Sequence, residues 1–284
     1  MTGAEQRTLL ITGCSSGIGL CIAEGLRERG YRVFATARKP DDVAALRARG
    51  LESLPLDLDD SMSIHAAMDE ILTRTGGTLY ALLNNAAYGQ PGAVEDLTRA
   101  ALRAQFETNV FGTLELTRRC IPVMRAQGYG RIINVSSLLG LVALPYRGAY
   151  TASKFALEGF SDTLRLELAG TGIHVVLIEP GPIESRFRVN AYTAYQDAID
   201  IERSAHREHY QAIERRLTRP DPSAPFTLPP AAVLKKVIHA LESPRPKVRY
   251  YVTVPTYFLA TLKRLLPYRL LDRVLMQIAR RENR

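Results

Sequence analysis

The chain has 284 residues, of which 46% are hydrophobic and 23% charged, enough apolar material for the core of one large α/β domain. The formal net charge is +8, yet residues 245–284 hold ten Lys or Arg against two Asp or Glu, so the rest of the chain is neutral. A neutral body with a basic tail excludes the broad basic surface of a nucleic-acid-binding domain.

The cysteines, the histidines and the N-terminal segment bear on metal binding and compartment. Cys14, Cys21 and Cys120 have neither the spacing of metal ligands nor that of a disulfide framework, and the five histidines are scattered. The first apolar strand begins near residue 8, which leaves no room for a signal peptide, and no apolar run approaches the roughly 18 residues of a spanning helix. We therefore expect a soluble, cytoplasmic protein that binds no metal ion.

Short apolar runs alternate with segments of helical periodicity along most of the chain. In chain order the pattern predicts a strand at 8–11, a helix at 18–29, a strand at 32–36, a helix at 44–49, a strand at 54–58, a helix at 61–73, a strand at 80–84, a helix at 97–126, a strand at 131–135, a helix at 149–168, a strand at 173–178, a helix at 231–241 and a strand at 248–254. Apolar strands separated by helices predict a parallel sheet covered on both faces. The expected fold class is therefore a doubly wound α/β sheet in a single domain, residues 1–254.

Two segments depart from this alternation. Residues 184–230 are polar, rich in Arg, Glu and Tyr, and are predicted to form a helical substrate lid, because so long a segment inside a compact domain is either functional or disordered. Residues 255–284 are predicted to form a basic helical extension, with Leu271, Val274, Leu275 and Ile278 on one face of its last helix. That face either packs on its own domain or on a second subunit, or lies on an anionic membrane surface.

Three glycines follow the first strand and open the first helix. Gly13, Gly17 and Gly19 have the spacing Gly-x-x-x-Gly-x-Gly. Glycines let a backbone approach a pyrophosphate closely, and the N-terminus of a helix supplies unpaired amides and positive potential. The same residues could form an ordinary tight strand-to-helix turn, so the motif by itself indicates a dinucleotide site without deciding it.

Tyr150 and Lys154 are four residues apart in a predicted helix, thirteen and seventeen residues after Ser137. Because positions four apart share one helical face, the Lys154 ammonium can favour ionisation of the Tyr150 phenol and is expected to lower its pKa. A phenol tuned in this way can act as a general acid and base. The alternative is a tyrosine packed under an extended lysine side chain.

From about Leu9 to Pro182 the chain resembles the short-chain dehydrogenase/reductase family in its single-domain form. Four motifs carry the resemblance in order: the glycine turn at 12–19, the asparagine turn at 84–87, the helix residue Asn109, and the set Ser137, Tyr150 and Lys154. Through 12–19 and 153–159 it looks most like bacterial NADPH-dependent aldehyde reductases and the hydroxysteroid and retinol dehydrogenase branch. Ala87 replaces a usual glycine and Ser185 a usual threonine, and both changes are small.

The resemblance implies a Rossmann fold and assigns roles to the catalytic residues. Tyr150 would donate a proton in reduction and accept one in oxidation, and Ser137 would hydrogen-bond the carbonyl or alkoxide oxygen. Lys154 would also hold the nicotinamide ribose, and Asn109 would anchor a water molecule that relays protons to Lys154. The neighbouring Ser136 is expected to make a backbone contact instead.

Cofactor choice is predicted from charge at the end of the second strand. NAD enzymes of this fold place an acidic residue there, whereas this chain has Arg38 followed by Lys39, so a 2′-phosphate is accommodated and NADP(H) is favoured over NAD(H). A solvated Arg-Lys pair is the alternative. The residues expected to touch the cofactor are Gly13, Ser15, Ser16, Gly17, Ile18, Gly19, Arg38, Asp57, Leu58, Asn85, Ala86, Tyr150, Lys154, Pro180, Gly181, Ile183 and Ser185.

The expected activity is hydride transfer between NADP(H) and a hydrophobic aldehyde, ketone or alcohol, as in a carbonyl reductase or alcohol dehydrogenase. Apolar residues at 139–146 would line the substrate pocket or form core, and aromatic residues after Pro182 could close over them. The expected partners are a small substrate, a second copy in a homodimer or homotetramer, and the inner membrane face through the C-terminal helix. A non-catalytic NADP(H) sensor and an epimerase or dehydratase remain the alternatives.

Overall fold

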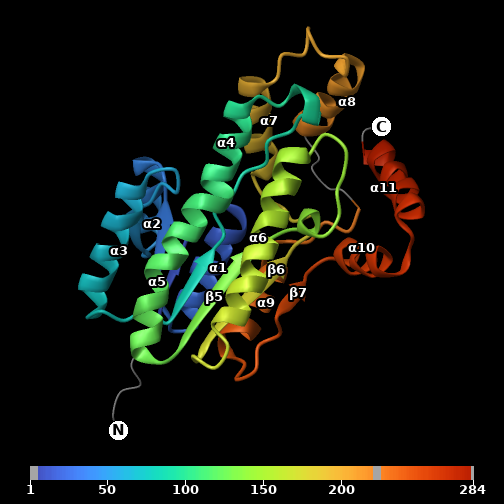
Figure 1. Cartoon of the computed structure of the whole chain (residues 1–284). Coiled ribbons are helices and arrows are strands. Elements are labelled where there is room, and N and C mark those ends of the chain that lie inside the picture. The colour runs from blue at the N-terminus through green and yellow to red at the C-terminus, as the bar shows by residue number, and fades with distance from the viewer. Residues whose placement is uncertain (1–5, 220–224, 283–284) are drawn as a thin grey trace.

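A computed structural model describes residues 6–219 and 225–282. Its centre is a wholly parallel seven-stranded sheet in the order β3-β2-β1-β4-β5-β6-β7 (Figure 1). The strands are β1 Thr8–Ile11, β2 Arg32–Ala37, β3 Glu52–Pro55, β4 Ala81–Asn84, β5 Gly130–Val135, β6 Ile173–Glu179 and β7 Arg249–Tyr251. The order changes direction between β1 and β4, where doubly wound sheets bind ligands beyond the carboxyl ends of their strands. The predicted fold class is confirmed.

Helices cover both faces of the sheet. One face carries α1 (Gly17–Glu28), α2 (Pro40–Ala48) and α9 (Ala231–Glu242), and the other carries α3 (Ser61–Thr75), α5 (Thr113–Gln127) and α6 (Gly148–Glu167). In β1, Leu9 and Ile11 belong to the first core and Leu10 to the second. Side chains alternate between the two faces of a strand, so a strand buried on both sides must be apolar throughout.

Four expected boundaries moved. The final strand, expected at 248–254, covers only Arg249–Tyr251, because a helix begins at Val254. The long helix at 97–126 is divided into α4 (Arg99–Phe106), a π-helical segment η2 (Glu107–Gly112) and α5, because a π-turn adds a residue that periodicity does not detect. β3 lies at Glu52–Pro55 rather than 54–58, because its pairing with β2 ends where β2 does, at Ala37. The helix expected at 44–49 begins at Pro40, since proline is favoured in a first turn.

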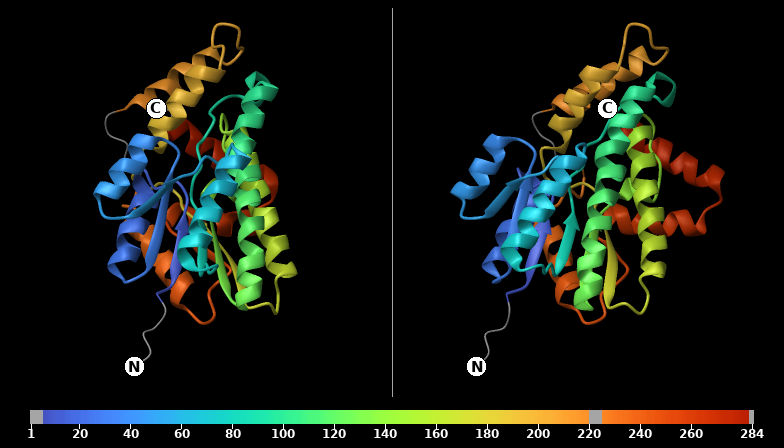
Figure 2. Two further views of the ribbon diagram at one scale, coloured as in Figure 1. Left: turned by 90° about the vertical axis from the view of Figure 1, so that its left-hand side faces the viewer. Right: turned by 60° about the vertical axis from the view of Figure 1, so that its left-hand side comes forward.

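The segment at 184–230 contains two helices, α7 (Phe187–Ala198) and α8 (Arg207–Thr218), which rise above the sheet (Figure 2); residues 220–224 lie outside the described part. The buried Tyr210 of α8 connects this segment to the rest of the domain through two hydrogen bonds. Its hydroxyl accepts a hydrogen bond from the backbone N–H of Ala93 at 2.9 Å and donates one to Asp96. Both partners lie in the β4–α4 connection, residues 85–98. Tyr210 therefore attaches α8 to a loop at the carboxyl ends of the strands.

The C-terminal extension forms a helical hairpin, α10 (Val254–Leu265) and α11 (Tyr268–Glu282), beside α6 (Figure 1); residues 283–284 lie outside the described part. Its apolar face packs on the β5–α6 loop, residues 136–147. The buried members of this contact are Leu138, Leu139, Val142, Leu144, Leu259, Leu271 and Leu275. Of the surfaces that the sequence left open for the last helix, its own domain is the one that Leu271 and Leu275 contact in this structure.

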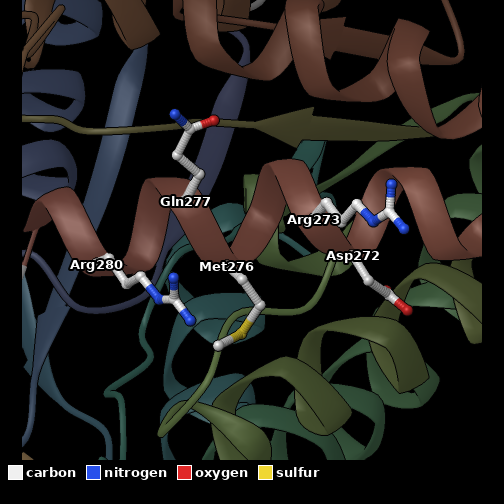
Figure 3. Close-up of a pocket in the computed structure, with 5 residues that line it drawn as sticks. All are labelled: Asp272, Arg273, Met276, Gln277 and Arg280. Atoms are coloured by element: carbon white, nitrogen blue, oxygen red, sulfur yellow. The ribbon is translucent and has the colours of Figure 1, made fainter.

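The other side of α11 is polar. Figure 3 shows a hollow there, lined by Asp272, Arg273, Met276, Gln277 and Arg280. Neither helix of the hairpin, nor any other in the described residues, is long and apolar enough to cross a bilayer. The hairpin is thus an amphipathic element with its apolar face turned inward.

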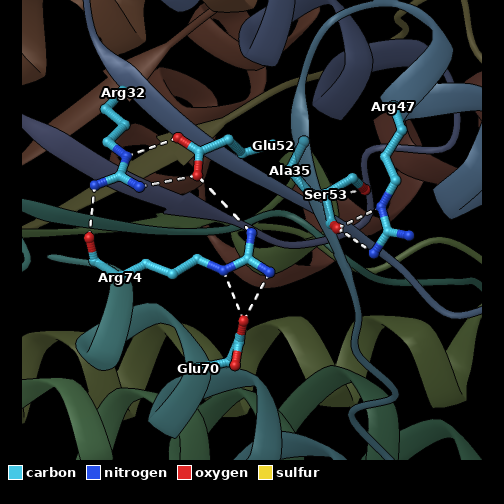
Figure 4. A network of polar contacts seen from close by, with 7 residues as sticks. All are labelled: Arg32, Ala35, Arg47, Glu52, Ser53, Glu70 and Arg74. Atoms are coloured by element: carbon cyan, nitrogen blue, oxygen red, sulfur yellow. Dashed lines mark hydrogen bonds and ion pairs between the residues drawn. The ribbon is translucent and has the colours of Figure 1, made fainter.

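A network of ion pairs lies at the amino ends of β2 and β3. Arg32, at the start of β2, pairs with Glu52 of β3 at 2.6 Å, and Arg74 of α3 pairs with Glu70 at 2.7 Å (Figure 4). Both pairs are partly exposed, and such pairs contribute at most about 1 kcal/mol each. The network joins the amino ends of the strands, whereas the functional residues lie at the carboxyl ends.

Candidate active site

The glycine turn after β1 is crowded by the loop after β4. Gly13 and Gly17 have φ values of +70° and +57°, which favour glycine. A Cβ on Gly13 would lie 2.7 Å from Ala86 Cα, and one on Gly19 would lie 2.2 Å from the Gly13 carbonyl oxygen. The side-chain amide of Asn85 donates to the Thr12 and Gly13 carbonyls, each at 3.0 Å. The predicted motif residues are therefore in contact.

The same turn fits the pyrophosphate of a dinucleotide. Ser16 is the N-cap of α1 but makes no side-chain cap bond, so no cap occupies the amides of the first turn. Ser15 is exposed and Ile18 half-buried at this end. A Cβ on Gly17 would come within 3.0 Å of Ser185 Cβ, so the loop after β6 closes over the turn. Unpaired amides at a helix N-terminus form a ready anion site.

Arg38, Asp57 and Leu58 lie beyond the ends of β2 and β3. Arg38 is exposed and lies near enough to Tyr88, in the β4–α4 connection, for its positive charge to act on the pKa of that phenol. Burial is the larger effect on Tyr88 and raises that pKa overall. Asp57 accepts a hydrogen bond from the Asp59 N–H at 3.1 Å, and Leu58 is buried. These residues occupy the edge where the adenosine half of a dinucleotide would lie.

The loop after β6 is fixed to the neighbouring loops. The Pro180 carbonyl accepts a hydrogen bond from the Leu138 N–H at 2.7 Å. A Cβ on Gly181 would lie 2.1 Å from Thr253 Oγ1, so only glycine fits against the start of α10. Ile183 pairs with Leu228 in an isolated bridge. The predicted nicotinamide contacts therefore lie next to the catalytic loop.

Ser137, Tyr150 and Lys154 meet where β5 leads into α6. The Lys154 ammonium donates to the Val135 carbonyl at 2.8 Å and lies 5.7 Å from the centroid of the Tyr150 ring. The Ser137 hydroxyl accepts the Leu139 N–H at 3.1 Å, and it is near enough to the Tyr150 phenol to lower its pKa. One reacting oxygen can thus contact both the serine hydroxyl and the phenol.

The direction of the Tyr150 pKa is opposite to the expected one. Burial raises it to about 12, and the hydrogen bond from Ser137 and the positive charge of Arg147 offset only part of this. Burial also lowers the pKa of Lys154 to about 8, against the pull of Glu158. The expectation of a lowered phenol pKa is therefore wrong for the protein without cofactor. Burial destabilises the phenolate more than the neighbouring hydroxyl and positive charge stabilise it.

Asn109 lies in η2, where the helix is locally widened. Its amide nitrogen donates to the Tyr88 carbonyl and to Ser153 Oγ, both at 3.0 Å, and its oxygen accepts the Tyr88 N–H at 3.2 Å. These bonds join the β4–α4 connection to the catalytic helix, one residue before Lys154. Widened turns of this kind are frequent at functional sites.

Phe187, the first residue of α7, packs against the ring of Tyr150. The Phe187 ring stands edge-on to Tyr150, with centroids 5.2 Å apart. Gly89 faces it, and a Cβ there would lie 2.7 Å from Phe187 Cζ. The sequence indicates aromatic residues that could close the site but does not show which of them touches Tyr150.

A buried ionic cluster behind the site was not predicted. Arg249 of β7 bonds Glu158, and reaches Asp162 and Glu179 at 2.6 Å each. Burial raises the pKa of both Glu158 and Glu179, and Arg249 pulls both back down. Glu158 is one turn beyond Lys154 and Glu179 precedes Pro180, so the cluster sets the catalytic helix against the loop after β6. In the sequence, the only signal for this ionic cluster is the four-residue spacing of Lys154 and Glu158.

The predicted substrate wall is divided between two clusters. Leu139, Val142 and Leu144 pack on the C-terminal hairpin, in a cluster that Tyr150 borders. Tyr146 instead stacks on His209 of the lid, with ring centroids 5.4 Å apart. Leu139, Val142 and Leu144 therefore form core where they face the hairpin, which is the second of the two interpretations of residues 139–146.

Comparisons with known proteins agree with this geometry. The family model for short chain dehydrogenases matches residues 7–196. An uncharacterized oxidoreductase of Escherichia coli K12, YbbO, is 44% identical over 95% of this chain and 94% of its own. The NADPH-dependent 3-dehydrocapnine reductase of Ornithobacterium rhinotracheale is 31% identical over 95% and 96%.

One solved structure with the same fold contains a bound cofactor. The short-chain dehydrogenase/reductase of Burkholderia phymatum, in complex with NAD, superimposes with a TM-score of 0.77 at 25% identity, over 93% of this chain and 94% of that one. The family match covers the glycine turn, Asn109 and the meeting of Ser137, Tyr150 and Lys154. The chain therefore belongs to the short-chain dehydrogenase/reductase family of nicotinamide-dependent oxidoreductases.

Proposed function

We propose that this protein is an NADP(H)-dependent reductase of hydrophobic aldehydes or ketones, or the dehydrogenase of the corresponding alcohols. The observation that carries the proposal is the placement of Ser137 and Lys154 next to Tyr150, with the Lys154 ammonium 5.7 Å from the centre of the Tyr150 ring, beside a glycine turn that fits a pyrophosphate. The cofactor supplies the hydride, and the chain must bind, orient and protonate. Cytoplasmic location and a homodimeric or homotetrameric state belong to the same proposal.

Each catalytic residue has a role that its surroundings support. The raised pKa of Tyr150 keeps the phenol protonated, so it can donate to an oxygen that gains negative charge in reduction. Ser137 is positioned to hydrogen-bond that oxygen. Lys154, with its pKa lowered to about 8, can exchange a proton near neutral pH, and Asn109 orients the neighbouring Ser153 and would hold the relaying water.

One assay tests the function against its alternatives. Reduced nicotinamide absorbance is followed with a panel of apolar aldehydes and ketones and with NADPH. Turnover supports the proposal. Binding of NADPH without turnover on any member of the panel would favour a sensor instead, and loss of a nucleotide-sugar substrate without net cofactor oxidation would favour an epimerase or dehydratase.

Arg38→Ala should reduce NADPH affinity by roughly tenfold to a hundredfold and leave NADH affinity nearly unchanged. Arg38 lies at the adenosine edge of the site, and a charge-assisted bond to a 2′-phosphate contributes about 1.5–3 kcal/mol. Binding of both cofactors by fluorescence titration measures the ratio. Lys39→Ala, at the neighbouring exposed position, is the matched control. An Arg38→Ala protein with the wild-type ratio contradicts the NADP(H) assignment.

The proposed membrane contact uses a different surface of the hairpin from the apolar face of the last helix that the sequence indicated. Leu265 and Tyr268, at the turn of the hairpin, are 72% and 80% exposed and lie beside Arg264 and Arg269. Exposed apolar side chains among basic ones suit an anionic lipid surface, where each basic residue contributes about 1 kcal/mol. We therefore place the proposed membrane contact at this turn.

Replacing Leu265 and Tyr268 together by glutamate should abolish co-sedimentation with vesicles of anionic lipid at low salt, while turnover persists. The change adds negative charge and removes the apolar anchor without disturbing the packed face of α11. Leu166→Glu, at an apolar position of α6 that is 67% exposed, is the control and should still sediment. Wild-type protein that stays in solution with the vesicles refutes the membrane contact.

A further inference from the structure

Arginines from different elements gather beside the catalytic helix. Arg147 ends the β5–α6 loop, Arg216 lies on α8 of the lid, and their side chains are 21% and 16% exposed. Glu282, in the last turn of α11, pairs with Arg147 and lies 4.0 Å from Arg216. Among the described residues it is the one carboxylate within 4.0 Å of either guanidinium. Figure 1 shows the end of α11 directed toward α8.

The positive charge in this cluster exceeds the negative charge. Burial lowers the pKa of Arg216 to about 9, and Arg147 and Arg188 lower it as well, while Glu282 raises it. The Nε atom of Arg216 is buried and has no hydrogen-bond partner in the described part of the chain. Arg147 and Arg216 share the one carboxylate of Glu282, a costly arrangement for partly buried guanidinium groups that an added anion would relieve.

The cluster is close to the chemistry. Arg147 is three residues before Tyr150, and its charge lowers the phenol pKa. The preceding residue, Tyr146, has φ = +62°, a strained value for a bulky side chain, and is held between His206 and His209 of the lid. The residue whose backbone turn precedes Arg147 is therefore in contact with the lid.

One side of α11 connects the apolar wall with the arginines. Ile278 packs in the cluster that Tyr150 borders, and Glu282 follows it by one helical turn, about 6 Å along the axis. The arginine cluster therefore begins about one helical turn from the apolar cluster that Tyr150 borders.

We propose that Arg147 and Arg216, with Arg188 beside them, bind the anionic end of the substrate, a carboxylate, phosphate or sulfonate carried on the apolar chain that bears the carbonyl. Glu282 holds the arginines together when no such group is bound. Guanidinium groups suit this role because they bind oxyanions bidentately and stay charged when buried. The inference rests on the proposed reductase function and specifies its substrate class as an anionic amphiphile.

The first test measures binding to the full-length protein without cofactor, by calorimetry, with decanoate and decan-1-ol as probes. Decanoate should bind roughly tenfold or more tightly than decan-1-ol, as one or two charge-assisted bonds imply. Arg216→Gln should remove the difference by weakening decanoate alone. Arg215→Gln, an exposed neighbour on the same helix, should keep it.

A second variant keeps the proposal open to refutation if Arg216→Gln fails to fold. Glu282→Gln removes the internal counter-ion, so decanoate affinity should rise severalfold while decan-1-ol affinity stays constant. Equal binding of both probes to the wild-type protein, or decanoate affinity unaffected by Glu282→Gln, would overturn the anion subsite. An equal loss for both probes in Arg216→Gln would show a structural role and overturn it as well.

The second test separates this inference from the proposed function. Oxo carboxylates of short, medium and long chain are compared with their methyl esters as substrates, with NADPH. A higher kcat/KM for the acids, lost in Arg216→Gln, supports the subsite. Turnover of both series at equal kcat/KM refutes the subsite but leaves the reductase function standing, whereas no turnover of either series refutes the reductase function itself.

Discussion

Replacing Tyr150 by phenylalanine should reduce carbonyl reduction by about 10²–10⁴-fold while NADPH still binds. The change removes only the hydroxyl that Ser137 contacts, and the ring keeps its packing against Phe187 and the hairpin cluster. The cofactor contacts of the glycine turn and Arg38 are untouched. Turnover is measured with the best aldehyde of the panel, and NADPH binding by fluorescence titration.

The control for this variant is Tyr192→Phe on α7, which removes a hydroxyl that bonds Glu214 at 2.9 Å. It should retain turnover within a few-fold, because that bond lies within the lid. If Tyr150→Phe reduced carbonyls at a rate near that of the wild type, the phenol would not be the proton donor, and the proposed mechanism would have to be abandoned.

The sheet and the order of its motifs could be predicted because they depend on local signals. Strands buried on both faces are apolar along most of their length, as residues 9–11 of β1 and 175–178 of β6 are. Gly13 and Gly17 need positive φ values, and the Tyr150–Lys154 spacing follows from helical geometry alone. Each of these signals lies within a few residues of sequence, which is the range over which periodicity and turn chemistry act.

The electrostatics of the site could not be predicted, because they depend on residues distant in sequence. The phenol pKa rises since Phe187 and the C-terminal hairpin bury Tyr150, and no local pattern announces either contact. In the same way, amphipathicity showed that α11 has an apolar face but could not say that the β5–α6 loop covers it. Arg249 meets Glu158 across 91 residues of sequence.

Replacing Arg249 by methionine should lower the free energy of unfolding by about 3–5 kcal/mol at neutral to alkaline pH. Arg249 is the cation that bonds Glu158, Asp162 and Glu179, and Glu179 has no exposed surface. Without it the two glutamates would remain as buried, mutually repelling carboxylates. Arg245→Met, at an exposed position just before β7, is the control and should change stability by less than about 0.5 kcal/mol.

The pH dependence identifies the cause. Burial already raises the folded-state pKa of both glutamates above the usual carboxyl value, so their contribution to stability is present at low pH and is lost as pH rises through the raised pKa values. Removing Arg249 raises them further, because its charge opposes the shift. The variant should therefore be least destabilised at about pH 5, where the carboxyls can take protons, and most at about pH 10, above the pKa of Glu179, which burial raises to about 8.

A second substitution separates charge from packing in this variant. Adding Glu179→Gln to Arg249→Met replaces one buried carboxylate by a neutral amide of the same shape, so a large part of the lost stability should return and the pH dependence should flatten. Urea unfolding of the wild type, both single variants and the double variant at the two pH values gives the coupling energy between the two residues. A destabilisation independent of pH, with no recovery in the double variant, would mean that Arg249 stabilises α6 and β7 through packing of its aliphatic part and not by compensating the glutamates.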